Sequence, residues 1–249
     1  MRHAALVTGG AKRIGRTIVE HLARAGYAVA IHCHFSEADA NGLAATIRDG
    51  GGHASVVTAD LFDPDAVAGL VEQATRALGP LDLLVNNASI FTPDDVGTLA
   101  IDSWDRHFAV NLRAPVFLSQ DFARQLPKDR PGSIVNVVDQ RVWKLTPQYV
   151  SYTLTKAALF TATQTLAQAL APRIRVNAVG PGPTLANERQ AEADFTRQSA
   201  AVLLGRGASP DEIAEAVLFL ARSPSITGQM IAVDGGQHLA WETADVVGE

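Results

Sequence analysis

The sequence predicts an α/β protein built on a doubly wound, seven-stranded parallel sheet with helices on both faces. Short runs rich in β-branched residues alternate with longer segments of helical periodicity along the whole chain. One run, LDLLVNN at residues 81–87, is nearly all apolar, which is typical of a strand buried on both faces. The length of 249 residues suits one such domain, and no linker, internal repeat or low-complexity tract divides it.

Each element is assigned from its own residues. Strands are expected where β-branched and other apolar residues form short runs, at residues 4–8, 28–32, 54–58, 81–86, 132–138, 175–179 and 230–233. Helices are expected where apolar residues recur at helical spacing, at residues 13–25, 38–49, 65–78, 103–125, 151–171 and 210–221. A ligand crevice should open where the parallel strands end, beside Gly9, Asp60, Asn87 and Asp139.

The least regular stretch is residues 180–207, which contains PGP and then a polar, helical piece. We expect it to be an insertion that forms a substrate lid over the crevice; a disordered surface loop is the alternative.

Composition excludes several classes of function. The net charge is −5 and the basic residues are scattered, which argues against nucleic-acid binding. No apolar run approaches the roughly 20 residues that span a bilayer, and the start MRHAALVTGG shows no secretion signal. Cys33 is the one cysteine, so no intrachain disulfide is expected, and a cytoplasmic location fits best.

The segment TGGAKRIG at residues 8–15 joins the first strand to the first helix. Gly9 and Gly15 permit a tight turn and the close approach of a pyrophosphate to the helix N-terminus. Lys12 and Arg13 are basic where the helix dipole disfavours positive charge, which favours a bound anion. A purely structural turn with solvated basic residues is the alternative.

The run HCHFS at residues 32–36 follows the second strand and contains no acid. An NAD site commonly places a carboxylate there, whereas His34, Ser36 and Arg13 would accept a 2′-phosphate. We therefore expect NADPH as cofactor. A metal site at His32 and Cys33 is not expected, because neighbouring side chains of a strand point to opposite faces.

Tyr152 and Lys156 lie one helical turn apart, so they share a face of the helix at 151–171. A tyrosine is a poor proton donor unless a nearby ammonium lowers its pKa, and Lys156 can supply that charge. The same spacing also arises by chance in surface helices.

Together with TGGAKRIG, Asp60, NNAS at 86–89, Asn111, PGPT at 181–184 and VDGG at 233–236, the pair resembles the short-chain dehydrogenase/reductase family over essentially the whole chain. The resemblance implies a Rossmann-type domain in which Tyr152 is the acid/base, Lys156 binds the nicotinamide ribose, and Asn111 supports a proton-relay water. It also implies a homotetramer assembled through the helices at 103–125 and 151–171, with a dimer as the alternative. With the turn and the 32–36 run, it assigns to the cofactor Gly9, Lys12, Arg13, Ile14, Gly15, His34, Ser36, Asp60, Leu61, Asn87, Ala88, Ser89, Lys156, Pro181 and Gly182.

Two departures from the family pattern resemble its pteridine reductase and dihydromonapterin reductase branch. Arg13 replaces the middle glycine of the turn, and Asp139 replaces the serine thirteen residues before Tyr152. In that branch the arginine serves cofactor phosphates and pterin, and Ser89 and Phe91 would contact the pterin. Phe35 departs from the branch, which commonly has an arginine there.

The chemistry agrees with this branch. An ionised Asp139 has no proton to polarise a ketone, but it can accept hydrogen bonds from a pterin, whose C=N bonds need a proton on nitrogen for each hydride. We expect an NADPH-dependent reductase that takes a dihydropterin, a pterin or dihydrofolate to the tetrahydro form, with Arg13, Ser89, Phe91, Asp139 and Tyr152 at the substrate. The alternatives are a carbonyl reductase and a non-catalytic NADPH-binding module. Asp139 as a helix cap or a partner of Arg141, and Phe91 as a core residue, are the structural alternatives.

Overall fold

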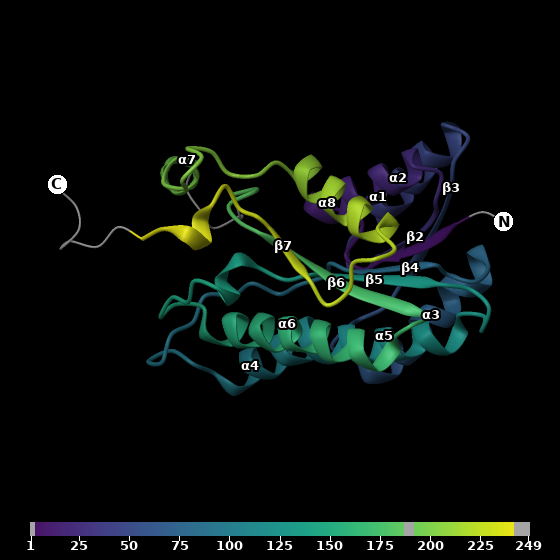
Figure 1. The fold of residues 1–249 in the computed structure, drawn as a ribbon, viewed down its shortest axis with the longest axis horizontal. Helices are drawn as coiled ribbons and strands as arrows, with labels where there is room; N and C mark the ends of the chain where they lie inside the picture. The colour runs from purple at the N-terminus through teal and green to yellow at the C-terminus, as the bar shows by residue number, and fades with distance from the viewer. Residues whose placement is uncertain (1–2, 187–191, 242–249) are drawn as a thin grey trace.

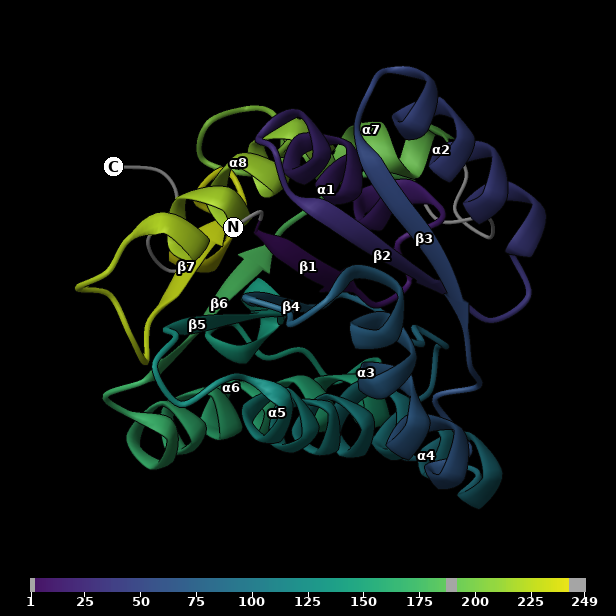
Figure 2. The same ribbon diagram turned by 90° about the vertical axis from the view of Figure 1, so that its right-hand side faces the viewer.

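A computed structural model describes residues 3–186 and 192–241. Seven strands form one sheet in the order β3-β2-β1-β4-β5-β6-β7, and every neighbouring pair is parallel. The strands are β1 (Ala4–Val7), β2 (Ala28–Cys33), β3 (His53–Thr58), β4 (Leu83–Asn86), β5 (Gly132–Val137), β6 (Ile174–Pro181) and β7 (Met230–Val233). Figure 2 shows β3 and β7 toward opposite sides of the sheet. The predicted seven-stranded parallel sheet is confirmed, although β6 extends two residues beyond its predicted end and β4 begins two residues late.

Helices cover both faces of the sheet (Figure 1). On one face lie α1 (Arg13–Arg24), α2 (Glu37–Asp49) and α8 (Pro210–Arg222). On the other lie α3 (Pro64–Leu78), α4 (Ile101–Phe108), α5 (Ala114–Gln125) and α6 (Val150–Leu170). The chain also forms α7 (Glu192–Ala200) and the short segments η1 (Ala109–Arg113), η2 (Gln140–Val142) and η3 (Gln237–Leu239).

The prediction of a single helix at residues 103–125 is wrong in detail. The helix begins at Ile101 and contains the π-helical segment η1 between α4 and α5. Pro115 has no N–H to donate to the carbonyl of Asn111, so the regular α-helical ladder cannot continue through this turn. The wider turn carries Asn111, one of the predicted site residues.

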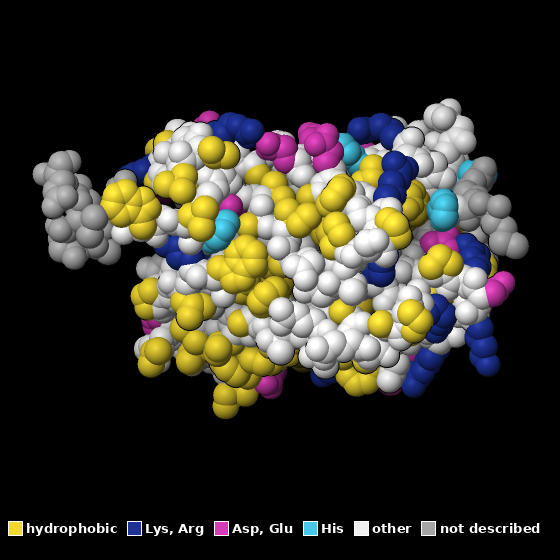
Figure 3. Space-filling model, viewed as in Figure 1, with side chains coloured by type: hydrophobic (Ala, Val, Ile, Leu, Met, Phe, Trp, Pro, Cys, Tyr) yellow, Lys and Arg dark blue, Asp and Glu magenta, His cyan; other side chains and the backbone are white. Residues whose placement is uncertain are grey.

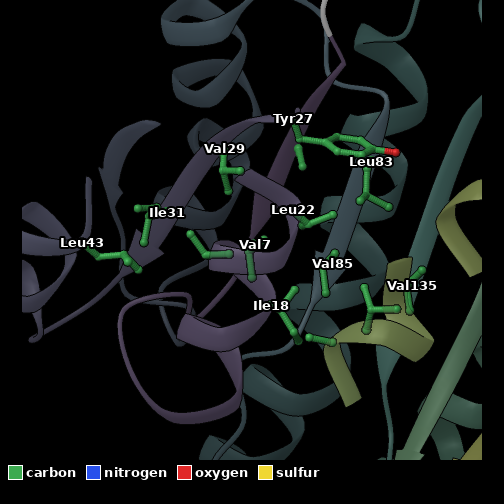
Figure 4. Packing of buried hydrophobic residues seen from close by; sticks show 14 of the residues in the cluster. Val7, Ile18, Leu22, Tyr27, Val29, Ile31, Leu43, Leu83, Val85 and Val135 are labelled. Atoms are coloured by element: carbon green, nitrogen blue, oxygen red, sulfur yellow. The ribbon is translucent and has the colours of Figure 1, made fainter. Parts of the chain in front are cut away.

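Two hydrophobic layers hold the sheet between its helices. Val7 of β1 and Val29 of β2 pack toward Ile18 and Leu22 of α1 (Figure 4). Leu6, the neighbour of Val7 on β1, belongs to the opposite layer, with α3 and α5. Each such side chain contributes about 1.5–3 kcal/mol when fully buried. Burial on both faces therefore explains the nearly continuous apolar runs and fixes the strand ends that carry the site.

The carboxyl ends of the strands lie on the left of Figure 1, where α7 and η3 are also found. Within the described part of the chain, no helix combines the length and apolarity needed to cross a membrane.

Candidate active site

The glycine turn after β1 is fixed by residues from distant strands. Gly9 has a φ of +61°, which glycine adopts without strain, and its N–H donates to Nδ1 of His32 at 3.0 Å. The His32 ring is then a donor at Nε2, where the Ala59 carbonyl lies at 3.1 Å. Burial lowers the pKa of His32 to about 4, so the ring stays neutral and can accept the Gly9 N–H. His32 is thus a structural part of the turn.

Asn87 holds the other side of the turn. Its side-chain amide donates to the carbonyls of Thr8 and Gly9 at 2.9 and 3.1 Å. The Thr8 hydroxyl in turn accepts the N–H groups of Asn87 and Ala88. The predicted cofactor residues after β1 and β4 are therefore brought together by direct hydrogen bonds.

Gly15 provides a sharp test of this packing. A Cβ at Gly15 would lie 2.1 Å from the Gly9 carbonyl oxygen and 2.6 Å from Nδ2 of Asn87. We expect Gly15→Ala to lower the free energy of unfolding by about 3 kcal/mol and to abolish cofactor binding. The matched control is Gly42→Ala in α2, where a Cβ meets nothing within 4 Å and should stabilise the helix by about 0.5–1 kcal/mol. Urea unfolding checks both, and equal stability of the two variants would contradict this packing.

The start of α1 fits a pyrophosphate. Its N-cap, Lys12, makes no side-chain capping bond, and no acidic residue lies in the first turn. The backbone N–H groups and the positive end of the helix dipole therefore face the turn without a protein anion. Arg13 and Ile14 follow, with Arg13 at a φ of +53°.

The two basic residues already have partners. Lys12 forms an ion pair with Asp39 at 3.1 Å, and a phosphate must compete with that carboxylate. The Arg13 guanidinium donates to the carbonyls of Leu185 and Ala186 at 3.3 and 2.9 Å. Arg13 therefore bridges the cofactor turn and the predicted lid.

The residues after β2 form an exposed group. His34 stacks on Phe35 with ring centroids 3.5 Å apart, and its Nδ1 lies 3.7 Å from an Asp60 carboxylate oxygen. Ser36 precedes α2 without a side-chain capping bond, and Leu61 is buried beside Asp60. No carboxylate follows β2 itself, as the sequence indicated. Within residues 3–186 and 192–241, no three His, Cys, Asp or Glu side chains gather as metal ligands.

Tyr152 and Asp139, the predicted catalytic pair, are hydrogen-bonded to each other. The Tyr152 hydroxyl donates to Oδ2 of Asp139 at 2.8 Å, and the Arg141 backbone N–H donates to Oδ1 at 2.8 Å. Asp139 therefore caps η2, as the alternative structural interpretation of this residue expected. It also accepts a hydrogen bond from Tyr152, the predicted acid/base. Both residues line the cavity described below.

Lys156 lies beside Tyr152, with its Nζ 5.6 Å from the ring centroid, and its effect on the pKa of Tyr152 stays a prediction. Burial, followed by the negative charge of Asp139, raises the pKa of Tyr152 well above its usual value. Burial also raises the pKa of Asp139. Lys156 itself is 2% exposed, donates to the Val137 carbonyl at 2.8 Å, and has a pKa lowered to about 8 by burial. Tyr152 is thus held protonated at neutral pH.

Asn111 anchors the segment that carries Ser89 and Phe91. Its side chain is fully buried, accepts from the Ile90 N–H at 2.8 Å and donates to the Ile90 carbonyl at 2.9 Å. It also accepts from Ser89 Oγ at 3.2 Å and donates to Thr155 of α6 at 3.3 Å. In this structure Asn111 positions the segment that carries Ser89 and Phe91 against α6, and its role toward a relay water stays a prediction.

A cavity of about 790 Å³ opens beside Tyr152. All five predicted substrate residues line it, namely Arg13, Ser89, Phe91, Asp139 and Tyr152, together with Pro181 and Gly182. Phe91 is 38% exposed, so it is not a core residue. Its ring stacks on Tyr149 with centroids 4.3 Å apart and meets Tyr152 edge-on at 4.7 Å.

The predicted lid contributes to the same cavity. Pro183, Thr184 and Leu185 line it after β6, and Asp194, Phe195 and Gln198 line it from α7. The polar helical piece expected in residues 180–207 is therefore present as α7, and residues 187–191 of that range lie outside the described residues.

Sequence reasoning missed several residues of this site. Tyr149 and Arg141 shape the cavity, His32 holds the turn, and Asp39 pairs with Lys12. Asp94 accepts the Ser151 N–H at the start of α6 from 57 residues away. A signal existed only for Arg141 and Tyr149, because they lie in the sequence between Asp139 and Tyr152, the two predicted catalytic residues.

The fold and the site define a dinucleotide-dependent oxidoreductase. Residues 9–238 match the family described as enoyl-(acyl carrier protein) reductase. L-xylulose reductase of Bos taurus is 38% identical over 93% of this chain and 95% of its own. A 3-oxoacyl-[acyl-carrier-protein] reductase of Staphylococcus aureus is 32% identical over 96% of this chain and 99% of its own. The chain belongs to the short-chain dehydrogenase/reductase family.

A solved structure is more similar still. FolM alternative dihydrofolate reductase 1 from Brucella canis, complexed with NADP, is 56% identical with a TM-score of 0.95 and covers 98% of this chain and 97% of that one. The Brucella suis protein, also in complex with NADP, is 56% identical with a TM-score of 0.96, covering 98% of each chain.

Proposed function

We propose that the protein is an NADPH-dependent reductase of pterins, acting on dihydropterins including dihydrofolate. The observation that carries this proposal is the hydrogen bond between Tyr152 and Asp139 in a cavity with an aromatic wall. The similarity to FolM structures bound to NADP supports it. The cofactor, when bound, supplies the hydride.

The residues account for the proton that must accompany the hydride. Tyr152 retains its proton because burial and the negative charge of Asp139 raise its pKa, and burial raises the pKa of Asp139, which makes its carboxylate a better proton acceptor. When Asp139 is protonated, it donates to the Tyr152 oxygen, and the Tyr152 hydroxyl turns to a ring nitrogen of the substrate. The pair then passes a proton inward as the C=N bond is reduced.

The cavity also orients a flat substrate. Phe91 presents a ring at the wall and Tyr152 lies at its edge, so a bicyclic ring against Phe91 places its nitrogens near the acid. Ser89, fixed by Asn111, adds a polar group beside it. The segment around α7 acts as the lid over this ring.

A spectrophotometric assay tests the proposal. NADPH oxidation is followed at 340 nm with dihydromonapterin, dihydrobiopterin, dihydrofolate and a panel of ketones, and is repeated with NADH. Turnover of dihydropterins with preference for NADPH supports the proposal. Turnover of ketones alone identifies a carbonyl reductase, and no turnover at all identifies a binding module.

Activity should fall as the pH rises through about 8. The pKa of Lys156 is lowered to about 8, so its ammonium is present below that pH and lost above it. The charge is needed to donate to cofactor hydroxyls and to balance Asp139. The pH profile of kcat/KM measures this, and a fall that begins only at about pH 10 or above would assign the alkaline limb to Tyr152 instead.

We further propose a homotetramer in which α5 and α6 form subunit contacts. The one charged residue of the 21-residue α6 is Lys156, which is buried, so its outer face carries no charge. Leu154 on that helix and Phe117 on α5 are 45% and 50% exposed. Figure 3 shows hydrophobic side chains gathered at the lower left, where α4 and one end of α6 lie in Figure 1. Loss of charge from a surface is typical of interfaces. Sedimentation that shows only a monomer would overturn this assembly.

A further inference from the structure

Arg141 occupies a fixed position in the wall of the cavity. Its guanidinium lies 5.0 Å from the ring centroid of Tyr149 and 5.8 Å from that of Phe91. Nη1 donates to the Thr146 hydroxyl at 2.7 Å, and the backbone N–H is held by Asp139. The charged end therefore lies beside the stacked rings of Tyr149 and Phe91, and Phe91 is the ring against which the substrate is proposed to lie.

No carboxylate of the described residues forms an ion pair with this guanidinium, although its charge acts on nearby Asp139 and opposes the rise in the pKa of that carboxyl. In the described ranges, none of the ion pairs involves Arg141. Asp139 uses its two oxygens for the Arg141 N–H and the Tyr152 hydroxyl, and Asp194, the other acid of the cavity wall, pairs with Arg197. An arginine that lines a cavity and makes no direct ion pair is suited to an anionic group of a ligand.

Arg13, the other cation that lines the cavity, is engaged differently. Both of its terminal nitrogens donate to the carbonyls of Leu185 and Ala186, and it adjoins the cofactor turn. A negative charge on the substrate side chain is therefore best received by Arg141, beside Tyr149.

We propose that Arg141 forms a carboxylate-binding subsite, so that the enzyme favours pterins whose side chain ends in a carboxylate over pterins with an uncharged side chain. This inference rests on the proposed pterin reductase function. The side chain that such a subsite selects is of the p-aminobenzoylglutamate type, whose ring can lie along Tyr149 while a carboxylate reaches the Arg141 guanidinium.

The test compares two substrates that share the reacting ring. The ratio of kcat/KM for 7,8-dihydrofolate to that for 7,8-dihydromonapterin is measured for the wild type, Arg141→Met and Arg141→Lys. A change in the shared chemistry at Tyr152 cancels in this ratio. We expect Arg141→Met to lower the ratio about tenfold or more, as for the loss of a charge-assisted hydrogen bond, and Arg141→Lys to lower it less. The control is Arg16→Met on α1, which removes an exposed arginine outside the cavity and should leave the ratio unchanged.

Ionic strength gives a second readout that needs no variant. Added NaCl should raise the wild-type KM for dihydrofolate more than that for dihydromonapterin, because only the first substrate carries the carboxylates. Turnover of both substrates with an unchanged ratio in Arg141→Met, or with equal salt dependence, overturns the subsite and leaves the pterin reductase function standing. If neither substrate is turned over, the subsite and the pterin reductase function are both overturned.

Discussion

Replacing Tyr152 by Phe should lower kcat by at least about 100-fold while NADPH still binds. The change removes only the hydroxyl that donates to Asp139, and the ring keeps its edge contact with Phe91. Loss of that hydrogen bond should cost about 1 kcal/mol in the free energy of unfolding, too little to unfold the protein. Steady-state kinetics, cofactor titration and thermal unfolding measure the three effects.

Tyr149→Phe is the matched control for this experiment. Tyr149 lines the same cavity and stacks on Phe91, but Tyr152 is the tyrosine whose hydroxyl bonds to Asp139. Its kcat should stay near the wild-type value. If Tyr152→Phe also retained kcat within a factor of three, Tyr152 would not be the proton donor.

Replacing Asp139 by Ser should change the substrate class. A serine hydroxyl cannot reload Tyr152 with a proton as a carboxyl of raised pKa can, so turnover of dihydropterins should fall about 100-fold. The same hydroxyl can donate to a carbonyl oxygen, so ketone reduction should be unchanged or should rise. The two activities are measured on one preparation with NADPH.

Asp194→Ser serves as the control for the loss of a cavity carboxylate. Asp194 lines the cavity from α7 but pairs with Arg197 and makes no bond to Tyr152. It should retain pterin turnover within a few-fold. A parallel loss of pterin and ketone activity in Asp139→Ser would mean that Asp139 serves only to hold the site together.

The fold was predictable because its central strands are buried on both faces and most of its helices are buried on one. Continuous apolar runs and apolar residues at helical spacing are local patterns, and each can be recognised in a short window of sequence. The π-helical turn η1 was not predicted, because the effect of Pro115 on the carbonyl of Asn111 is visible only once the helix is known to continue past it. The boundaries of β4 and β6 depend on pairing with neighbouring strands.

The site residues that belong to a sequence motif could be predicted. The contacts between segments distant in the sequence could not. Tyr152, Asp139, Ser89 and Phe91 line one cavity as the resemblance implied. The raised pKa of Tyr152 depends on burial and on the direction of the Asp139 carboxylate, which no spacing reveals. His32 holds Gly9 across 23 residues, and nothing local to either residue signals that contact.

The central claim is that this site reduces a pterin, and analysis of the product tests it most directly. NADPH and 7,8-dihydropterin substrates are incubated anaerobically with the enzyme, and tetrahydropterin is quantified by chromatography against the NADPH consumed. We predict one tetrahydropterin formed per NADPH oxidised, with no product from Tyr152→Phe. NADPH consumption without tetrahydropterin, or reduction of ketones only, would contradict the assignment.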